Sequence, residues 1–532
     1  MKTHSRYDGL NSFAPGSSQT SLSDGELLRP NEVLGNPTPG AKEFSPSYPP
    51  GIFDKTLLTI KPIACAWLIL LAGCAVGPKY VRPAVPVPAA YKENKDWKIA
   101  QPQDNVLKGE WWKIFNDPQL DALEAQVDIS NQNIAAAQAR YAQAYALVQA
   151  SRSSFFPVLT ANGSYTRSHG SSPVKGKNVS SQTLLNADVT WEVDLWGKIR
   201  RTIESNLAQA QASAADLANA RLSAQAQLAQ DYFELAALDG QKKLLDDTVV
   251  LYKKFLQLTK NRYAGGVAGQ SDVIQAQTQL EATRAQDIDI GVARSQVEHA
   301  IAVLIGKPAS VFSIPSLTLP SAVPFVPAGL PSQLLERRPD IASAERTVAA
   351  ANASIGVAEA AYFPTLILSA SGSYESSNLA DLFSSPNPLW SLGPALAETI
   401  FDAGLRRSQT AQAKAVYDED VANYRQTVLA AFGQVEDNLA ALRILQQENQ
   451  VQDVTVKDAR KAVDLEMNQY KQGTVSALDV ITTQAGALAD ERTDVTILGQ
   501  RLNACVLLIE YLGGGWTENR VISGIAVEGK TG

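Results

Sequence analysis

One string in the sequence could bind phosphate. Residues 524–531 read Gly-Ile-Ala-Val-Glu-Gly-Lys-Thr, which matches the phosphate-binding loop pattern GxxxxGK[ST]. Such a loop works when a strand precedes it and a helix follows it, because the amide groups at the helix start hold the phosphate. The segment after Trp516 is short and contains Gly, and only Gly532 follows Thr531, so neither element is predicted. We expect no nucleotide binding. The alternative that rests on this string is a hydrolase or nucleotide-dependent enzyme, and the missing strand and helix argue against it.

Residues that could bind a metal or perform catalysis are few and scattered. The three histidines, His4, His169 and His299, are far apart in the sequence, and there are two methionines and three cysteines. No GxSxG, HExxH, CxxC or EF-hand pattern occurs, and the carboxylates are spread along helical faces. We therefore expect no catalytic residue, no metal site and no cofactor.

One cysteine lies in a context that predicts covalent modification. Lys55 and Lys61 precede an apolar run over 63–73, an arrangement typical of a secretory signal peptide and too short to span a membrane as a helix. The run ends in Leu-Ala-Gly-Cys at 71–74, which resembles the lipobox of bacterial lipoproteins. The alternatives are an ordinary signal-peptide cleavage site or a buried strand.

We expect Cys74 to carry a diacylglycerol and to become the N-terminus after cleavage. Ala75 follows it, instead of the Asp that commonly retains such lipoproteins in the inner membrane, so the outer membrane is favoured. Residues 1–50 are rich in Ser, Pro and Gly, which indicates disorder. Because a secretory signal should not follow fifty-odd polar residues, we expect translation to start near Leu57 or Leu58.

Composition excludes further classes of protein. The net charge is −7 and the pI is about 5.3, whereas a general nucleic-acid binder presents a basic surface, so we expect no nucleic-acid partner. With 45% apolar and 19% charged residues the chain should fold, and 532 residues allow several domains. No apolar run reaches the roughly 18 residues that a membrane-spanning helix needs.

The sequence repeats itself at a spacing of 207 residues, the separation of Phe156 and Phe363. Chance agreement at one constant spacing over so long a span is implausible, so we infer a duplicated unit. The other pairs at this spacing include Gly197 and Gly404, Arg200 and Arg407, Tyr263 and Tyr470, Gly266 and Gly473, Asp272 and Asp479, and Gln277 and Gln484.

The sequence of each unit predicts the same order of helices and strands. A first helix ends at a proline, Pro157 or Pro364. Two strands follow, and the clearer one alternates apolar and polar side chains, which is typical of a half-buried strand and fits an outer-membrane strand. The alternative is an ordinary soluble hairpin. The predicted ranges are 121–154, 158–168 and 183–195 in the first unit, and 341–362, 365–375 and 389–401 in the second.

Two segments predict unusually long helices. Residues 198–263 and 405–470 contain no Pro and one Gly each, and at ~1.5 Å per residue each helix would extend about 100 Å. Because no single globular core is that long, we expect coiled pairs or a tube. Short turns and second helices follow, at 271–305 and 477–511.

The predicted domains follow from these elements. The linker between the units contains seven prolines, which forbid a long helix. The boundaries are 1–73 for the N-terminal extension and signal peptide, 74–306 for the first unit, 307–340 for the linker, 341–516 for the second unit and 517–532 for a loose tail.

The order of elements and several local strings resemble the outer-membrane efflux proteins, the TolC-like channel-tunnels. The nearest branch is the lipid-anchored NodT and OprM type. The resemblance covers about 74–516, and its most specific string is Leu-Leu-Glu-Arg-Arg-Pro-Asp-Ile at 334–341. Others are Cys-Ala-Val-Gly-Pro at 74–78, Trp-Glu-Val-Asp-Leu-Trp-Gly at 191–197 and Leu-Gly-Gly-Gly-Trp at 512–516.

The resemblance implies an α+β membrane protein that forms a homotrimer. Each protomer would give four strands to one β-barrel of twelve strands in the outer membrane, and the long helices would form a periplasmic tunnel with a closed mouth. The strands support this independently, because a barrel needs about eight strands and an open edge in lipid leaves backbone groups unpaired.

The implied function is a passive exit duct of a tripartite efflux pump for drugs or other toxic small molecules. Its implied partners are a periplasmic adaptor (membrane fusion) protein, an inner-membrane transporter of the proton-driven resistance-nodulation-division type, and outer-membrane lipid. The alternatives are a type I secretion duct and a lipid-anchored periplasmic helical scaffold without a pore. The alternating strands argue against the scaffold.

The resemblance also implies a gate. In the family, polar contacts among Tyr, Arg and Asp close the mouth near the helix turns of the second repeat. Tyr470 and Asp479 match this pattern. Val475 stands where the family can have Arg, and Thr482 where it has a second Asp, so the tyrosine–arginine contact is in question here.

The two helix turns match the places where the family meets its adaptor. This implies adaptor contacts for Gly266 and Asp272 in the first turn and for Gly473 and Val475 in the second. The alternative role for Asp272 and for its counterpart in the second turn is capping of the helix that follows, and both roles can hold.

Overall fold

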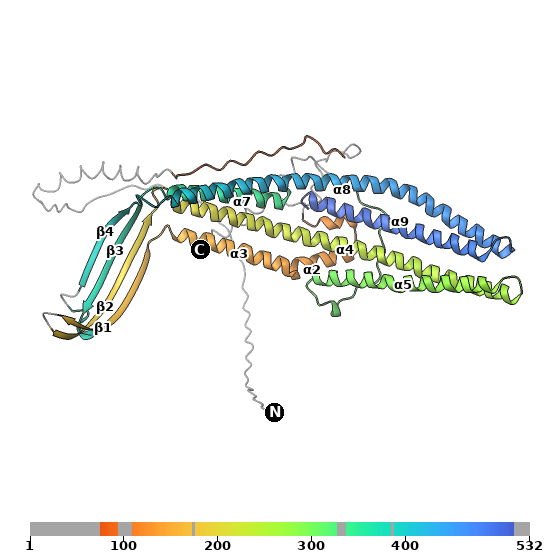
Figure 1. Cartoon of the computed structure of the whole chain (residues 1–532), viewed down its shortest axis with the longest axis horizontal. Helices are drawn as coiled ribbons and strands as arrows, with labels where there is room; N and C mark the ends of the chain where they lie inside the picture. Colours follow the sequence, from red (N-terminus) through yellow and green to blue (C-terminus); the bar gives the residue numbers. More distant parts are fainter. Residues whose placement is uncertain (1–74, 94–108, 173–175, 327–336, 385–387, 515–532) are drawn as a thin grey trace, which may run out of the picture. The chain divides into compact units, whose positions relative to one another are not determined.

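The computed structural model describes residues 75–93, 109–172, 176–326, 337–384 and 388–514. They all belong to one compact unit, Ala66–Gly532. The same succession of elements occurs twice in this unit, as the sequence predicts (Figure 1). The first succession is α3 (Gln132–Ser153), β1 (Val158–Ser172), β2 (Gly176–Val193), α4 (Lys198–Ala264) and α5 (Gln270–Leu304), and the second is α7 (Pro339–Ala360), β3 (Thr365–Ser376), β4 (Pro388–Ala397), α8 (Leu405–Gln472) and α9 (Ala477–Tyr511).

The four strands form one antiparallel sheet in the order β1-β2-β3-β4. The register places Val158 opposite Thr190, Val193 opposite Leu366, and Thr365 opposite Ala397. Strands of both halves therefore share the sheet, and in the described chain β1 and β4 each have one neighbour only. The predicted strands are confirmed, although β2 begins earlier than the alternation suggested.

The sheet has one apolar and one polar face. Cross-strand partners Val189, Ala370 and Leu392 lie on the apolar face, and the neighbouring row of Asp188, Ser371 and Ser391 lies on the polar one. The hydroxyls of Ser371 and Ser391 are 2.8 Å apart. Leu392 is 77% exposed in the single chain, so the apolar face is not covered by the chain's own helices.

Each long helix begins at a glycine in a left-handed conformation. Gly197 has φ +83° and Gly404 has φ +90°, a region that favours glycine. An aspartate before each glycine accepts hydrogen bonds from the first amides of the helix. Asp194 accepts from the amides of residues 199 and 200 at 3.0 Å, and Asp402 accepts from those of residues 404 and 406 at 2.9 and 3.2 Å. These carboxylates occupy the helix terminus where negative charge is favourable.

The single first helix predicted over 121–154 is wrong. The structure has two helices, α2 (Pro118–Ser130) and α3, separated at Asn131. The Asn131 side chain accepts hydrogen bonds from the amides of Asn133 and Ile134, at 2.9 and 3.1 Å, and donates to the carbonyl of Leu304 at 2.8 Å. An Asn that caps a new helix and bonds a distant segment offers the backbone an alternative to a continuous helix.

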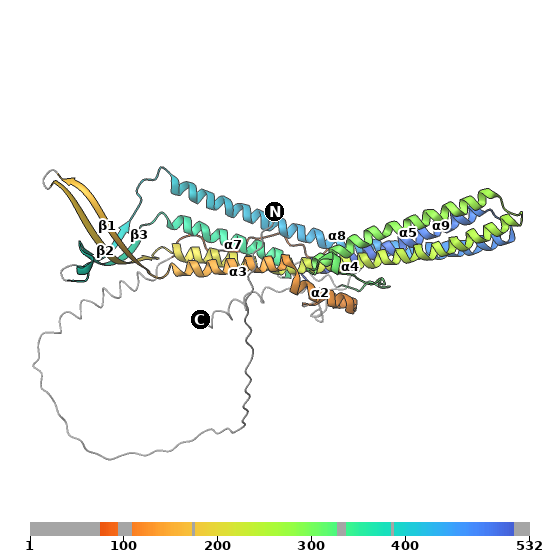
Figure 2. The ribbon, with the colours of Figure 1, turned by 90° about the horizontal axis from the view of Figure 1, so that it is seen from below.

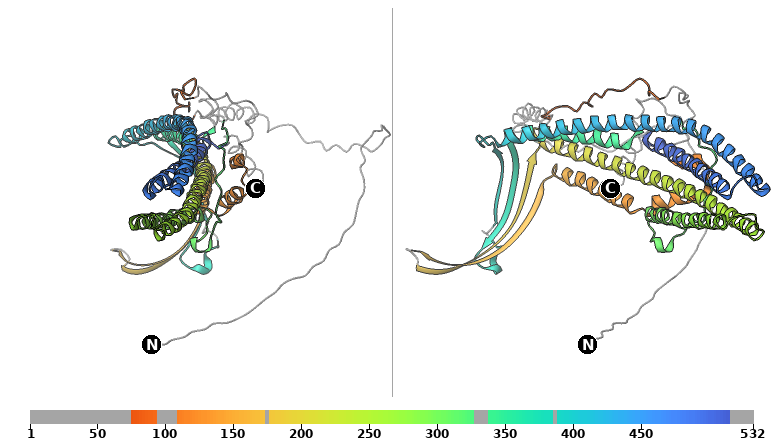
Figure 3. Two further views of the ribbon diagram at one scale, coloured as in Figure 1. Left: turned by 90° about the vertical axis from the view of Figure 1, so that its right-hand side faces the viewer. Right: turned by 45° about the vertical axis from the view of Figure 1, so that its right-hand side comes forward.

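Helix α4 is the central element of the helical region. It packs against α2, α3, α5, α7 and α9, whereas α8 packs against α7 and α9 (Figure 2). Viewed along their axes, the long helices form a curved layer (Figure 3). The largest core cluster joins α2 and the short helix η3 (Trp111–Phe115) to α4, α7, α8 and α9. Within it the rings of Phe115 and Phe233 are 4.7 Å apart. Two further short helices are η4 (Ala309–Val311) and η6 (Leu379–Asp381).

Residues 75–93 form an extended segment that is bonded to three helices. The Val76 amide donates to the Trp196 carbonyl at 3.0 Å, just before α4. The Tyr80 hydroxyl donates to buried Glu345 of α7, and further along Glu93 forms an ion pair of 2.7 Å with Arg443 of α8. Among the described residues, no helix is apolar over a stretch long enough to cross a bilayer.

Candidate functional site

The first helix turn connects α4 and α5, and the amide of Val267 closes it by donating to the Arg262 carbonyl at 2.9 Å. Gly266 has φ +72°, and a Cβ added there would meet nothing within 4 Å. Gly269 precedes α5, and its amide donates to the Asp272 carboxylate at 3.0 Å. Because Gly269 has no side chain, only this one arm of a capping box exists. Tyr263, near the end of α4, is 48% exposed.

The second turn connects α8 and α9 and carries a complete capping box. Gly473 ends α8 with φ +81°. The Ser476 hydroxyl accepts from the Asp479 amide at 3.3 Å, and the Asp479 carboxylate accepts from the Ser476 amide at 2.9 Å and from its hydroxyl at 2.7 Å. Both Asp residues therefore cap a helix, and their capping partners are Gly269 for Asp272 and Ser476 for Asp479.

Hydrogen bonding fixes the charge of Asp479. The hydroxyl and amide of Ser476 stabilise the carboxylate, and this lowers the pKa of Asp479 below its usual value. The side chain is exposed, so its negative charge faces solvent in the single chain. A capping role and a charged surface at the turn are compatible.

Tyr470 is buried at the contact between α8 and α4. It is 2% exposed, and its hydroxyl is 3.1 Å from the Thr259 hydroxyl of α4. Its ring lies 5.2 Å from that of Phe255, and the Arg262 guanidinium lies 4.5 Å from the ring centroid and donates to the Tyr470 carbonyl. Tyr470 thus joins the α8–α9 hairpin to α4 within one chain.

The tyrosine–arginine contact questioned from the sequence does exist, but with a different arginine. Val475 is half-buried and packs against the cluster around Tyr470, so it supplies no polar contact. Sequence reasoning missed Arg262 and Thr259. The one available signal was that Arg262 immediately precedes Tyr263, the counterpart of Tyr470 in the first unit.

Thr482 remains on the surface, as its assignment to a channel mouth requires. Its side chain is exposed, and its hydroxyl donates to the Leu478 carbonyl one turn earlier in α9. Cys74 lies outside the described residues. The structure begins at Ala75, which lies so close to Gly197 that a Cβ on Gly197 would come within 2.8 Å of it.

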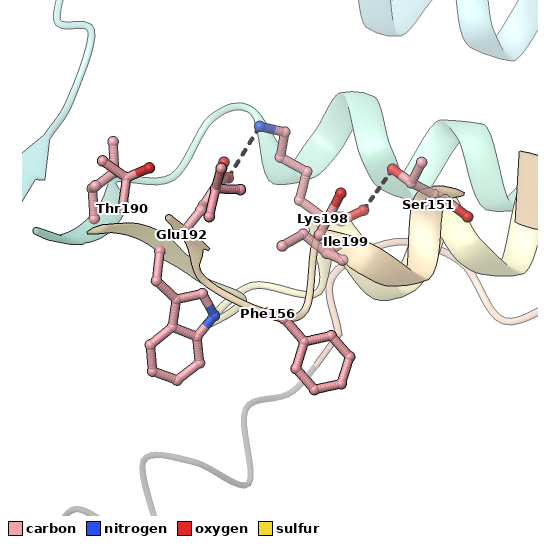
Figure 4. A pocket seen from close by; sticks show the side chains of 11 residues that line it. Ser151, Phe156, Thr190, Glu192, Lys198 and Ile199 are labelled. Atoms are coloured by element: carbon pink, nitrogen blue, oxygen red, sulfur yellow. Dashed lines mark hydrogen bonds and ion pairs between the residues drawn. The ribbon is translucent and has the colours of Figure 1, made fainter. Parts of the chain in front are cut away.

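The junction between the sheet and the helices holds a pocket of about 410 Å³ (Figure 4). Lys198 at the start of α4 and Glu192 near the end of β2 face one another there, with Nζ and Oε1 3.1 Å apart. Phe156 points away from this pair. Among the described residues, no group of three or more His, Cys, Asp or Glu side chains could hold a metal ion.

The fold and the comparisons define the class of protein. Residues 120–307 and 330–514 match the family model described as "Outer membrane efflux protein". The chain belongs to this family, and it is an outer-membrane channel component of an efflux pump. The family is one of channel proteins and not of enzymes, and the resemblance seen in the sequence is confirmed.

Particular relatives narrow the identification. The chain is 30% identical over 464 residues to the pyoverdine export outer membrane protein OpmQ of Pseudomonas aeruginosa, covering 85% of this chain and 96% of OpmQ. It is 30% identical over 473 residues to the probable efflux pump outer membrane protein TtgC of Pseudomonas putida, covering 87% and 96%. The solved outer-membrane channel OprN has a TM-score of 0.78 and 30% identity, covering 83% of this chain and all of OprN.

Proposed function

We propose that three copies of the chain form one barrel of twelve strands above one helical tunnel. The observation that carries this proposal is the sheet with two open edges, β1 and β4. Four strands cannot close a barrel, and in lipid the unpaired groups of both edges would be costly. Pairing β1 of one protomer with β4 of the next removes both edges. The exposed apolar face, with Leu392, would then face lipid, and the row of Asp188, Ser371 and Ser391 would face the lumen.

The assembled trimer acts as a passive exit duct. It performs no chemistry, and an inner-membrane transporter of the resistance-nodulation-division type supplies the energy. A periplasmic adaptor meets the helix turns and opens the mouth, which Asp479 and Thr482 line. The cargo is a small organic molecule, a class that includes pyoverdine, named for one relative.

The remaining parts of the chain fit this duct. Cys74 carries the lipid anchor, and the bond between Val76 and Trp196 holds the segment after it at the sheet-proximal end of α4. The two halves derive from one duplicated unit of a helix, two strands and a helical hairpin, joined by the proline-rich linker over 307–340. The support for a duplication is the repeated order of elements together with the constant spacing in the sequence.

Native mass measurement in detergent tests the proposal. We expect a mass of three chains, and we expect purified trimers to form pores in planar bilayers. A stable monomer that keeps its full β-sheet content would contradict the proposal, because it would show that the open edges of β1 and β4 can be tolerated.

A further inference from the structure

A second polar pocket, also of about 410 Å³, lies where α9 passes between α4 and α8. This volume is sufficient for a small organic molecule. Most of its lining is polar, and it draws on all three helices. The lining residues are Gln241 of α4, Glu448 of α8, and Ala489, Arg492, Thr493, Thr496, Ile497 and Gln500 of α9.

The pocket contains both signs of charge, and neither is neutralised. Arg492 donates to the Gln241 amide oxygen at 3.3 Å, which leaves its positive charge without a carboxylate partner in the described chain. Its Nε is buried and has no hydrogen-bond partner among the described residues. Glu448 is exposed and forms no ion pair with any described residue. In the pocket at the sheet junction, by contrast, Lys198 and Glu192 neutralise one another.

The pocket lies on the face of α9 that also carries Thr482. The exposed residues Ala489, Thr493, Thr496 and Gln500 follow Thr482 at intervals of seven, four, three and four, which is the spacing of one helical face. If Thr482 lines the mouth, as proposed above, this face of α9 lines the tunnel wall as the helix runs away from the mouth.

We propose that this pocket is a transient binding site for small hydrophilic zwitterions on their way through the tunnel. A ligand carboxylate would accept hydrogen bonds from the guanidinium of Arg492, and such charge-assisted bonds are among the stronger ones. A ligand ammonium would lie toward Glu448, and the hydroxyls of Thr493 and Thr496 would bond its polar middle. This inference rests on the proposed function for the position of the pocket in the lumen.

Such a site must bind weakly. Conduction requires a site that cargo enters readily and also leaves, so tight binding would block the duct. The exposed Glu448 and the open, shallow arrangement of three helices favour rapid release. The site would therefore bias which molecules dwell in the tunnel without closing it.

The test uses triglycine as the probe and the purified full-length trimer. Saturation-transfer NMR should detect triglycine binding, and N-acetyltriglycine amide, which lacks both charges, should bind at least tenfold more weakly. Arg492→Gln and Glu448→Gln should each weaken triglycine binding about tenfold. The matched control is Arg284→Gln on α5, whose arginine is exposed and pairs with Glu281 on its own helix, and this variant should bind triglycine normally.

Two outcomes would overturn the inference. Equal binding of triglycine and its uncharged analogue would show that the site does not recognise zwitterions. Unchanged binding in both Arg492→Gln and Glu448→Gln would show that the pocket is not the site. Oligomer mass and pore conductance measured on the same samples separate this failure from failure of the proposed duct, since trimeric pores that bind no triglycine leave the duct intact. If Arg492→Gln does not fold, Glu448→Gln still decides the question.

Discussion

The two helix turns share a sequence pattern but differ in the side-chain contacts that hold them. Each has a tyrosine, a glycine with positive φ and an aspartate at equivalent positions. In the first turn Tyr263 is half exposed and Asp272 makes one capping bond to Gly269. In the second turn the equivalent tyrosine is buried and the capping box is complete.

The asymmetry comes from contacts between the two hairpins. Arg262 and Thr259 of α4 reach across to Tyr470, which fixes the second turn against the first hairpin. Gln469, the counterpart of Arg262 in the second unit, has an exposed side chain and makes no equivalent return contact in the described structure. Two turns with the same sequence pattern thus differ in their side-chain contacts: the second is fixed against the first hairpin through Tyr470, and it is the candidate gate of the proposed trimer.

Breaking the contact with Arg262 should have the largest effect. Arg262→Ala removes a hydrogen bond from a charged group and a cation–π contact, which together contribute about 1–3 kcal/mol. We expect the conductance of the trimer in planar bilayers to rise about tenfold. Amide exchange over 470–479 should also accelerate about tenfold. Gln469→Ala, the matched control in the other hairpin, should change neither, and equal effects of the two variants would contradict the asymmetry.

The second-largest effect is expected from reversing the charge of the aspartate in each turn, measured as ion selectivity. Three copies of Asp479 around the mouth should favour cations, so Asp479→Arg should shift the selectivity toward anions. Asp272→Arg should have a smaller effect if its hairpin lies outside the constriction. Reversal potentials in planar bilayers, measured at low salt because exposed charges are screened beyond about 8 Å at physiological ionic strength, report the difference. A larger shift from Asp272→Arg would assign the gate to the first turn.

The pH dependence of selectivity should follow the hydrogen bonds of Asp479. Because Ser476 lowers the pKa of Asp479, the carboxylate stays charged to a lower pH than an ordinary Asp side chain does. Its stabilising effect is present above the pKa of the unfolded chain and is lost as the pH falls through the lower pKa of the folded chain. We expect cation selectivity to stay constant as the pH falls from 7 to about 4, the ordinary pKa of an Asp side chain, and to decline only below it. In Ser476→Ala the decline of cation selectivity on acidification should begin at a higher pH than in the unmodified protein. An unchanged pH profile would show that the Ser476 hydrogen bonds do not set the pKa of Asp479.

Exchanging the N-cap residues of α9 and α5 should give the smallest effect, a change in thermal stability. Ser476→Ala should destabilise the start of α9 by about 1 kcal/mol, because it removes a side-chain cap. Gly269→Ser should add the missing arm at α5 and stabilise it by roughly a few tenths of a kcal/mol, because glycine is itself tolerated at an N-cap. Gly269 has φ −80°, and the neighbour closest to an added Cβ is the mobile Ser271 hydroxyl at 3.1 Å, so the substitution is sterically feasible. Thermal unfolding of the trimers measures both shifts, and destabilisation by Gly269→Ser would contradict the comparison.

Elements that depend on local periodicity were predicted well from the sequence. Alternation revealed the strands around Val189 and Ala370, and the absence of Pro revealed α4 and α8. The break at Asn131 was missed because a single Asn does not interrupt a helical pattern, and its partner, the Leu304 carbonyl, is distant in sequence. The contact between Arg262 and Tyr470 was missed for the same reason, because the two residues are 208 positions apart in the sequence.

Chemical cross-linking tests the central claim, that the second turn surrounds the threefold axis, most directly. A cysteine is placed at Asp479 or at Asp272 in the trimer and treated with a short bis-maleimide. Cys505 is fully buried, so it should not compete for the reagent. We expect Asp479→Cys to give covalent dimers of the chain on a denaturing gel and Asp272→Cys to give none. Dimers from Asp272→Cys alone, or from neither variant, would contradict the assignment of the gate to the second turn.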